Sequence, residues 1–146
     1  MRIKPISRIT TLALVAILVL SAGTVAPAGH AAGDPILVTA KGKGTIKIGS
    51  ETFQVSSVVV KMLDDGTAEI TLVSEITFFL SGKWTADSTS PKSYNLQITG
   101  SGASAGAQGT GKVVMRDDGT SLDRLTAQGG TKTSSRKVSV EFVADK

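Results

Sequence analysis

Apolar and polar residues alternate one by one along most of the chain after residue 33. Such a period of two predicts half-buried β-strands, because successive side chains of a strand point to opposite faces of the sheet. Ser, Thr and Val stand where a helix would need helix formers, and no window of about 11 residues in this part carries a helical apolar stripe. The clearest alternation puts these residues on one face: Ala68, Ile70, Leu72, Ile76, Phe78, Leu80 and Trp84.

Residues that favour turns divide this pattern into about eight strands. The breaks lie at Asp64-Asp65-Gly66, at 87–91, at Asp117-Asp118-Gly119 and at Gly129-Gly130. We expect strands at the following ranges, of which the first two form one strand if it bends at Gly42 or Gly44: 36–41, 43–49, 53–63, 67–74, 76–85, 93–101, 109–116, 121–128 and 136–144. The glycine-rich segment 100–111 is interpreted as a loop, as strands that bend sharply at a barrel corner, or as a flap over a cavity mouth.

A short internal similarity supports this division. Residues 61–67 and 114–120, which are 53 positions apart, share the tetrapeptide Asp-Asp-Gly-Thr preceded by a methionine and one further residue. Seven residues are too few to establish a duplication, and each copy fits a tight hairpin. The fold class predicted for residues 33–146 is all-β, as a single antiparallel domain. Because near-neighbour hairpins dominate, an up-and-down barrel is favoured over a two-layer sandwich.

Residues 1–32 have the organisation of a cleavable signal peptide. Arg2, Lys4 and Arg8 form a basic start, residues 12–20 are an unbroken apolar run, and small residues follow up to Ala32, near which we expect the cut. Nine apolar residues are too few for a membrane-spanning helix, which needs about 20, although an uncleaved anchor is the alternative. The sequence therefore predicts an exported bacterial protein, periplasmic or extracellular, without stable membrane insertion after cleavage.

Charge and composition exclude several function classes. Removal of the leader takes three basic residues and no acidic ones, which lowers the net charge from +4 to +1. The remaining cations are spread singly, apart from Arg136-Lys137, so we predict no nucleic-acid partner. The six aromatic residues are too few for the two girdles of an outer-membrane barrel.

The side chains that most catalytic mechanisms need are scarce. The chain has no Cys, and its one His, His30, lies in the leader. Thiolate and imidazole chemistry, and Cys-ligated metals, are therefore excluded. The glycine-rich stretch that ends at Lys112 has the spacing of a phosphate-binding loop, but Val113 stands where that loop needs Ser or Thr. We predict no enzyme, no catalytic residues, no cofactor and no metal; a hydrolase that uses two carboxylates is the minor alternative.

Gly82-Lys83-Trp84 resembles the Gly-x-Trp signature of lipocalins and avidin-like barrels. In those families the signature lies in the first barrel strand, whereas here it lies in mid-chain. The resemblance covers three residues, and it implies that Trp84 packs at one end of a barrel and closes it. The alternation alone favours a plain core position for Trp84.

The leading hypothesis is a non-enzymatic binding module for a small apolar or amphipathic ligand. The ligand would be held in or at the mouth of the barrel by Ile76, Phe78, Leu80 and Trp84. The alternative is a structural or adhesive component of the cell envelope that acts through protein–protein contacts, because Val59, Phe79 and Val143 are predicted to face outward.

Overall fold

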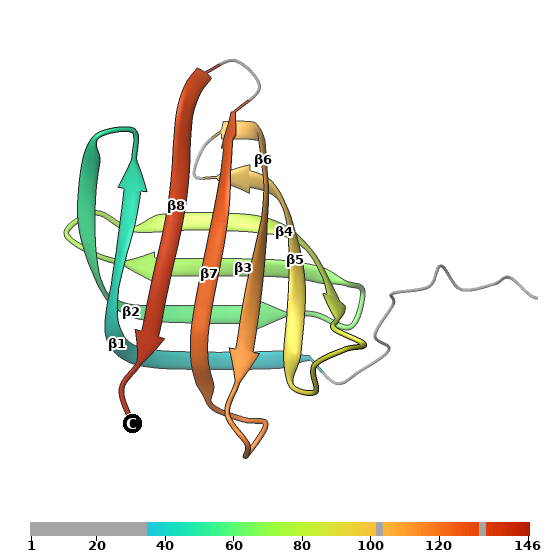
Figure 1. Cartoon of the computed structure of the whole chain (residues 1–146). Coiled ribbons are helices and arrows are strands. Elements are labelled where there is room, and N and C mark those ends of the chain that lie inside the picture. Colours follow the sequence, from blue (N-terminus) through green and yellow to red (C-terminus); the bar gives the residue numbers. More distant parts are fainter. Residues whose placement is uncertain (1–34, 102–103, 132–133) are drawn as a thin grey trace, which may run out of the picture.

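The computed structural model describes residues 35–101, 104–131 and 134–146 (Figure 1). Eight antiparallel strands in these ranges form a closed barrel in which each strand pairs with its sequence neighbours and the last pairs with the first. The prediction of an all-β, up-and-down barrel is confirmed; the predicted leader, residues 1–32, lies outside the described residues. The strands are β1 (Ile36–Ile48), β2 (Glu51–Met62), β3 (Thr67–Val73), β4 (Phe78–Ala86), β5 (Ser93–Ser101), β6 (Ser104–Met115), β7 (Leu122–Thr131) and β8 (Ser134–Ala144).

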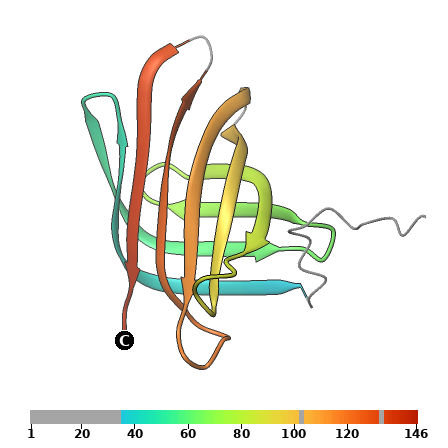
Figure 2. The same ribbon diagram turned by 45° about the vertical axis from the view of Figure 1, so that its right-hand side comes forward.

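The barrel is flattened into two layers of four strands. In Figure 1, β3, β4, the start of β1 and the end of β2 run across the picture behind β5–β8, which run up and down, and Figure 2 shows the same crossing. The end of β1 and the start of β2 turn upward beside β8. β1 joins the layers, because residues 36–41 pair only with β2 whereas residues 44–48 pair with both β2 and β8. The described part of the chain contains no helix long and apolar enough to cross a membrane.

Glycines lie where the strands bend and approach one another closely. A Cβ atom added to Gly44 would collide with the Glu141 carbonyl oxygen, and one added to Gly82 with that of Gln97. Pairing shifts register between Lys41 and Gly44, and between Ser81 and Gly82, as expected where bulges curve strands into a barrel. The first two predicted ranges are therefore one bent strand.

One prediction for a glycine-rich segment was wrong, and one predicted strand starts earlier than expected. Gly129 and Gly130, predicted as a turn, lie inside β7, where Gly129 pairs with Gly109. A Cβ at Gly129 would collide with the Gln108 carbonyl oxygen, so glycine serves strand contact here. β6 begins at Ser104 and not at residue 109, and β5 extends to Ser101 with a register shift between Ile98 and Gly100. Of the interpretations given for segment 100–111, bent strands therefore fit the described residues.

The interior is filled by side chains from both layers. A ring contact stands toward each end of β4: Phe53 and Phe78 at its start (centroids 5.2 Å apart), and Trp84 with Tyr94 near its end (5.4 Å, edge to face). Two small hollows are lined largely by core residues of the described barrel, and the larger has a volume of about 40 Å³. The largest fully buried side chains are Phe142, Ile46, Met62, Leu72, Leu122, Leu125, Val58, Val60, Val113 and Val140.

The two halves of the barrel repeat one hairpin. β2 and β6 both have 12 residues, and their bounds are 53 positions apart. In the turns that follow, Gly66 and Gly119 have positive φ (82° and 69°), and each N–H donates to the carbonyl three residues before it (3.0 and 2.8 Å). The Asp before each glycine accepts a hydrogen bond from the N–H of the following Thr, at 2.7 and 2.8 Å. The similarity seen in the sequence is therefore a shared turn geometry.

Candidate functional site

The structure separates the four residues predicted to bind a ligand. Ile76 was predicted to face inward, which is wrong: it lies in the turn between β3 and β4, and 56% of its surface is exposed. The predicted strand 76–85 begins only at Phe78, because residues 74–77 turn the chain and break the alternation. Phe78 is half-buried against Phe53, and Leu80 is buried.

Trp84 lies toward the other end of β4 from Phe78. It is 3% exposed, packs against Tyr94, and its Nε1–H donates to the Leu63 carbonyl oxygen at 2.7 Å. This bond ties β4 to the turn between β2 and β3. Leu80 alone of the four lines the 40 Å³ cavity. Ligand pockets usually begin near 300 Å³, and the 40 Å³ cavity beside Leu80 is well below that size.

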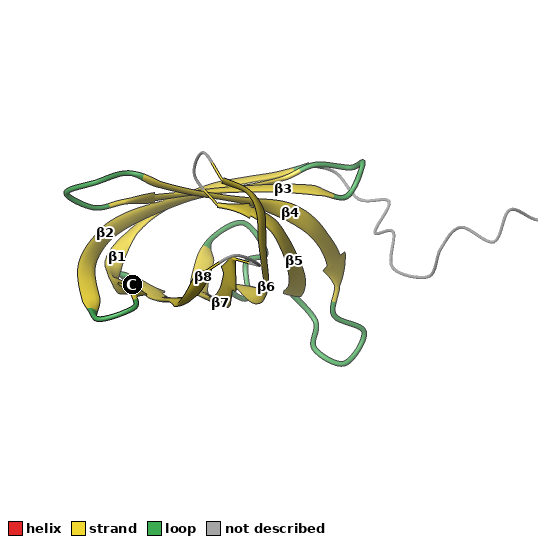
Figure 3. Cartoon of the chain, turned by 90° about the horizontal axis from the view of Figure 1, so that it is seen from above, coloured by secondary structure: helices red, strands yellow, loops and turns green. Residues whose placement is uncertain are grey.

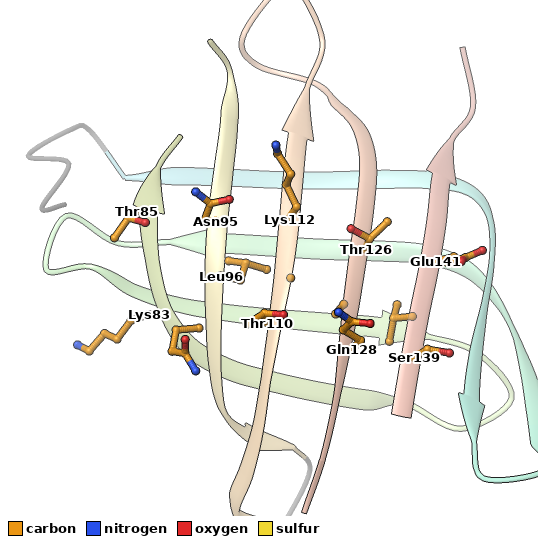
Figure 4. A pocket seen from close by; sticks show the side chains of 14 residues that line it. Lys83, Thr85, Asn95, Leu96, Thr110, Lys112, Thr126, Gln128, Ser139 and Glu141 are labelled. Carbon is orange, nitrogen blue, oxygen red and sulfur yellow. The ribbon is translucent and has the colours of Figure 1, made fainter. Parts of the chain in front are cut away.

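A much larger hollow lies on the outer face of β4–β8 (Figure 4). It has a volume of about 780 Å³ and is open to solvent, and we call it the polar groove. A second hollow of about 750 Å³ shares Thr110, Gln128 and Ser139 with it and extends toward Lys137. Residues lining the polar groove are Lys83, Thr85, Asn95, Leu96, Gln97, Thr110, Gly111, Lys112, Thr126, Ala127, Gln128, Ser139, Val140 and Glu141.

Strand register arranges the polar side chains of the groove in two rows, which can be followed in Figure 4. Each row takes one residue from each of five neighbouring strands, so its members stand about 4.8 Å apart. In chain order, the first row is Lys83, Gln97, Thr110, Gln128 and Ser139. The second row is Thr85, Asn95, Lys112, Thr126 and Glu141.

Most of these side chains have no partner within the part of the chain that the structure describes. Gln97 Nε2 donates to the Gly109 carbonyl oxygen at 3.2 Å, and Lys83 Nζ to Thr67 Oγ1 at 3.4 Å. The groove therefore offers hydroxyl and amide groups that are free to bind a ligand. Those without a side-chain hydrogen bond or ion pair in the described ranges are Thr85, Asn95, Thr110, Thr126, Gln128, Ser139 and Glu141.

Lys112 is the groove cation that has a carboxylate partner. Its Nζ lies 2.7 Å from Asp87 Oδ2, at the start of the loop between β4 and β5. Thr89 donates to Asp87 Oδ1 through both its hydroxyl (2.7 Å) and its N–H (2.9 Å). The hydrogen bond from Lys112, followed by those from Thr89, holds the pKa of Asp87 well below its ordinary value. Asp87 therefore stays ionised and largely neutralises Lys112 near neutral pH.

Comparisons of the chain with protein-family models, curated proteins and solved structures find no match. The chemistry of the groove follows from its own side chains. Amides and hydroxyls both donate and accept hydrogen bonds, whereas Glu141 is the single carboxylate among the lining residues. The groove therefore has the means to bind a polar molecule.

The alternation of apolar and polar residues in the sequence indicated some of the outward-facing residues of the groove. Asn95 and Gln97, Thr110 and Lys112, and Ser139 and Glu141 are polar pairs at alternate positions of their strands. Alternation assigned such residues to an outer face but gave no reason to connect pairs from different strands. The register across β4–β8 makes that connection.

Proposed function

We propose that the protein is a non-enzymatic binding module that holds an uncharged, hydroxyl-rich ligand, such as a saccharide chain, across the polar groove. The observation that carries this proposal is the pair of five-residue rows of hydrogen-bonding side chains. Four gaps of about 4.8 Å give each row a length of about 19 Å. An extended ligand that crosses the strands would meet a new polar group at every step.

The lining distinguishes three ligand classes. An apolar ligand finds no large cavity, since the described barrel interior leaves about 40 Å³. An anionic ligand finds Lys112 already paired with Asp87 at 2.7 Å and would meet Glu141 in the same row, so Lys83 is the one lining cation without a carboxylate partner in the described ranges. A neutral, hydroxyl-rich ligand needs both donors and acceptors, which the unpartnered amides and hydroxyls supply. The third class therefore fits best.

The predicted leader adds a cellular location to the proposal. Residues 1–32 are an export signal in this interpretation, and the module acts in the bacterial periplasm or outside the cell, where saccharide polymers are abundant. The absence of Cys, the position of His30 in the leader and the single groove carboxylate support a binding role without catalysis.

The test is a titration of the purified protein, followed by the backbone amide signals in nuclear magnetic resonance. The probes are cellotetraose, maltotetraose and the tetramer of N-acetylglucosamine, with tetra-alanine as a peptide. We expect at least one saccharide to shift the signals of Thr110, Thr126 and Gln128. Shifts with tetra-alanine alone, or with none of the four probes, would refute the proposed ligand class.

Two variants locate the binding. Thr110→Val and Gln128→Leu each remove neutral hydrogen bonds worth about 0.5–1.5 kcal/mol, so each should weaken binding about 2- to 12-fold. Thr52→Val is the matched control, because Thr52 is an exposed strand residue of β2 outside the groove lining. Equal weakening by the control, or unchanged affinity in both groove variants, would contradict the assignment.

A further inference from the structure

Lys112 is held in the polar groove by a carboxylate that is itself fixed. Its Nζ lies 2.7 Å from Asp87 Oδ2, and the Asp87 side chain is only 10% exposed. The N–H and the hydroxyl of Thr89 donate to the other carboxylate oxygen, at 2.9 and 2.7 Å. The ammonium group therefore has a defined place, and because it carries three N–H donors, two remain for a ligand.

The loop between β4 and β5 keeps Asp87 beside the groove. The Asp87 N–H donates to the Ser93 carbonyl oxygen at 2.9 Å, which closes the base of the loop. Near its end, Lys92 has a positive φ of 63°, and its carbonyl oxygen accepts a hydrogen bond from the Met115 N–H at 2.8 Å. This bond joins the loop to β6, the strand that carries Lys112. Seen from above, the loop extends outward beyond the layer of β5–β8 (Figure 3), so it stands beside the groove as a raised edge.

Hydrogen-bond acceptors stand on both sides of this ammonium group. Strand register places Asn95 of β5 directly opposite Lys112, and Thr126 of β7 opposite it on the other side. Figure 4 shows the three side chains next to one another. Asn95 is exposed, and neither it nor Thr126 has a side-chain partner in the described ranges. The centre of the second row thus combines strong donors on Lys112 with an acceptor about 4.8 Å away on each neighbouring strand.

This combination suits a secondary amide better than a hydroxyl or a carboxylate. An amide separates its acceptor, the carbonyl oxygen, from its donor, the N–H, so the two can meet groups on neighbouring strands. A hydrogen bond from an ammonium group is about twice as strong as one between neutral groups, and a carbonyl oxygen can accept it. A carboxylate would also accept it, but it would be repelled by Asp87 beside Lys112 and by Glu141 in the same row.

We propose that Lys112 and Asn95 bind an acetamido group, in which Lys112 donates to the carbonyl oxygen and the Asn95 side-chain oxygen accepts from the N–H. This assignment, which rests on the proposed function, narrows the ligand to a chain of N-acetylated amino sugars. Such a chain is uncharged and rich in hydroxyl groups, so the rest of both rows can bind it as well. Asp87 is a positioning residue, because it acts on the ligand through the Lys112 ammonium group.

Cellotetraose and the tetramer of N-acetylglucosamine test this assignment. The two have the same sugar backbone, and they differ only in whether each ring carries a hydroxyl or an acetamido group at one position. Isothermal titration calorimetry measures both dissociation constants for the protein, expressed from its full coding sequence and purified in the form its host delivers. We expect the acetylated tetramer to bind about tenfold more tightly, which is the difference between a hydrogen bond to a charged group and one between neutral groups.

Four variants locate this preference. Lys112→Met and Asn95→Leu should each reduce it to less than about threefold, and Asp87→Asn should reduce it in part. Lys83→Met is the matched control, because Lys83 is the groove cation without a carboxylate partner in the described ranges; it should change the preference less than about twofold. The ratio of the two constants in one preparation does not depend on how much of the protein is folded, so it separates recognition from a structural role.

The outcomes distinguish this assignment from the proposed function. Equal affinity for the two tetramers, tighter binding of cellotetraose, or a preference that both Lys112→Met and Asn95→Leu leave unchanged would overturn the acetamido site and leave a saccharide-binding groove. Binding of maltotetraose alone would have the same consequence. Binding of no saccharide at all would overturn the acetamido site and the proposed function together.

Discussion

Replacement of Trp84 by Phe tests how the barrel end is closed. The indole is 3% exposed, contacts the ring of Tyr94 and donates a hydrogen bond of 2.7 Å to the Leu63 carbonyl oxygen. Phe keeps an aromatic ring in this position but removes the N–H donor and two carbon atoms. The tie between β4 and the β2–β3 turn is therefore lost, while the hydrophobic character of the position stays.

The structure bounds the cost of this change. The Leu63 carbonyl still accepts a hydrogen bond from the Gly66 N–H at 3.0 Å, so it keeps one partner and the loss is about 1 kcal/mol. Each buried carbon group removed from a packed site costs a further 0.5–1.5 kcal/mol, roughly. We therefore expect the free energy of unfolding to fall by about 2–4 kcal/mol.

Urea denaturation followed by far-ultraviolet circular dichroism measures this loss, since the variant lacks the chain's one tryptophan. Tyr94→Phe is the control: it keeps the ring contact, and at this half-exposed position it should change stability by less than about 0.5 kcal/mol. A loss below about 1 kcal/mol for Trp84→Phe would show that the indole hydrogen bond and packing do not stabilise this end.

Two further substitutions test the strand bends and the turns. Gly82→Ala should lower the free energy of unfolding by about 1–3 kcal/mol, because the added Cβ collides with the Gln97 backbone. The control Ser81→Ala, at the exposed neighbouring residue, should show almost no change in the same urea assay. Equal effects of the two substitutions would refute the close-contact explanation. Hydrogen bonds from the Ser121 hydroxyl, then from the N–H groups of Thr120 and Ser121, lower the pKa of Asp118 from 3.8 to about 2. The lower folded-state pKa stabilises the fold above about pH 4, and this contribution is lost as the pH falls toward 2. Asp118→Asn should therefore weaken the acid dependence of stability over that interval, and an unchanged dependence would contradict the proposed role of the turn.

Local pattern was sufficient for most of the fold. Alternation and turn residues predicted the strands, and the hairpins at Gly66 and Gly119 have the positive φ that favours glycine. The errors arose where a residue type has two physical uses. Gly129 can make a turn or admit a neighbouring strand, and only the pairing with Gly109 decides between them. Ile76 continues the apolar alternation numerically, but the turn at 74–77 removes it from the strand.

The polar groove depends on the register between strands, which the local sequence pattern does not specify. Each strand specifies which of its residues face outward, but a shift of one pair by two residues would keep every side chain on its face and destroy the rows. Thr110 stands opposite Gln128 because bulges and close glycine contacts set the register of β6 on β7. These contacts join segments that are distant in sequence, so no local pattern encodes them. An insertion of two residues in β6 would thus keep each side chain on its face of the sheet but would misalign the two rows. The proposed binding therefore depends on strand register and not on composition.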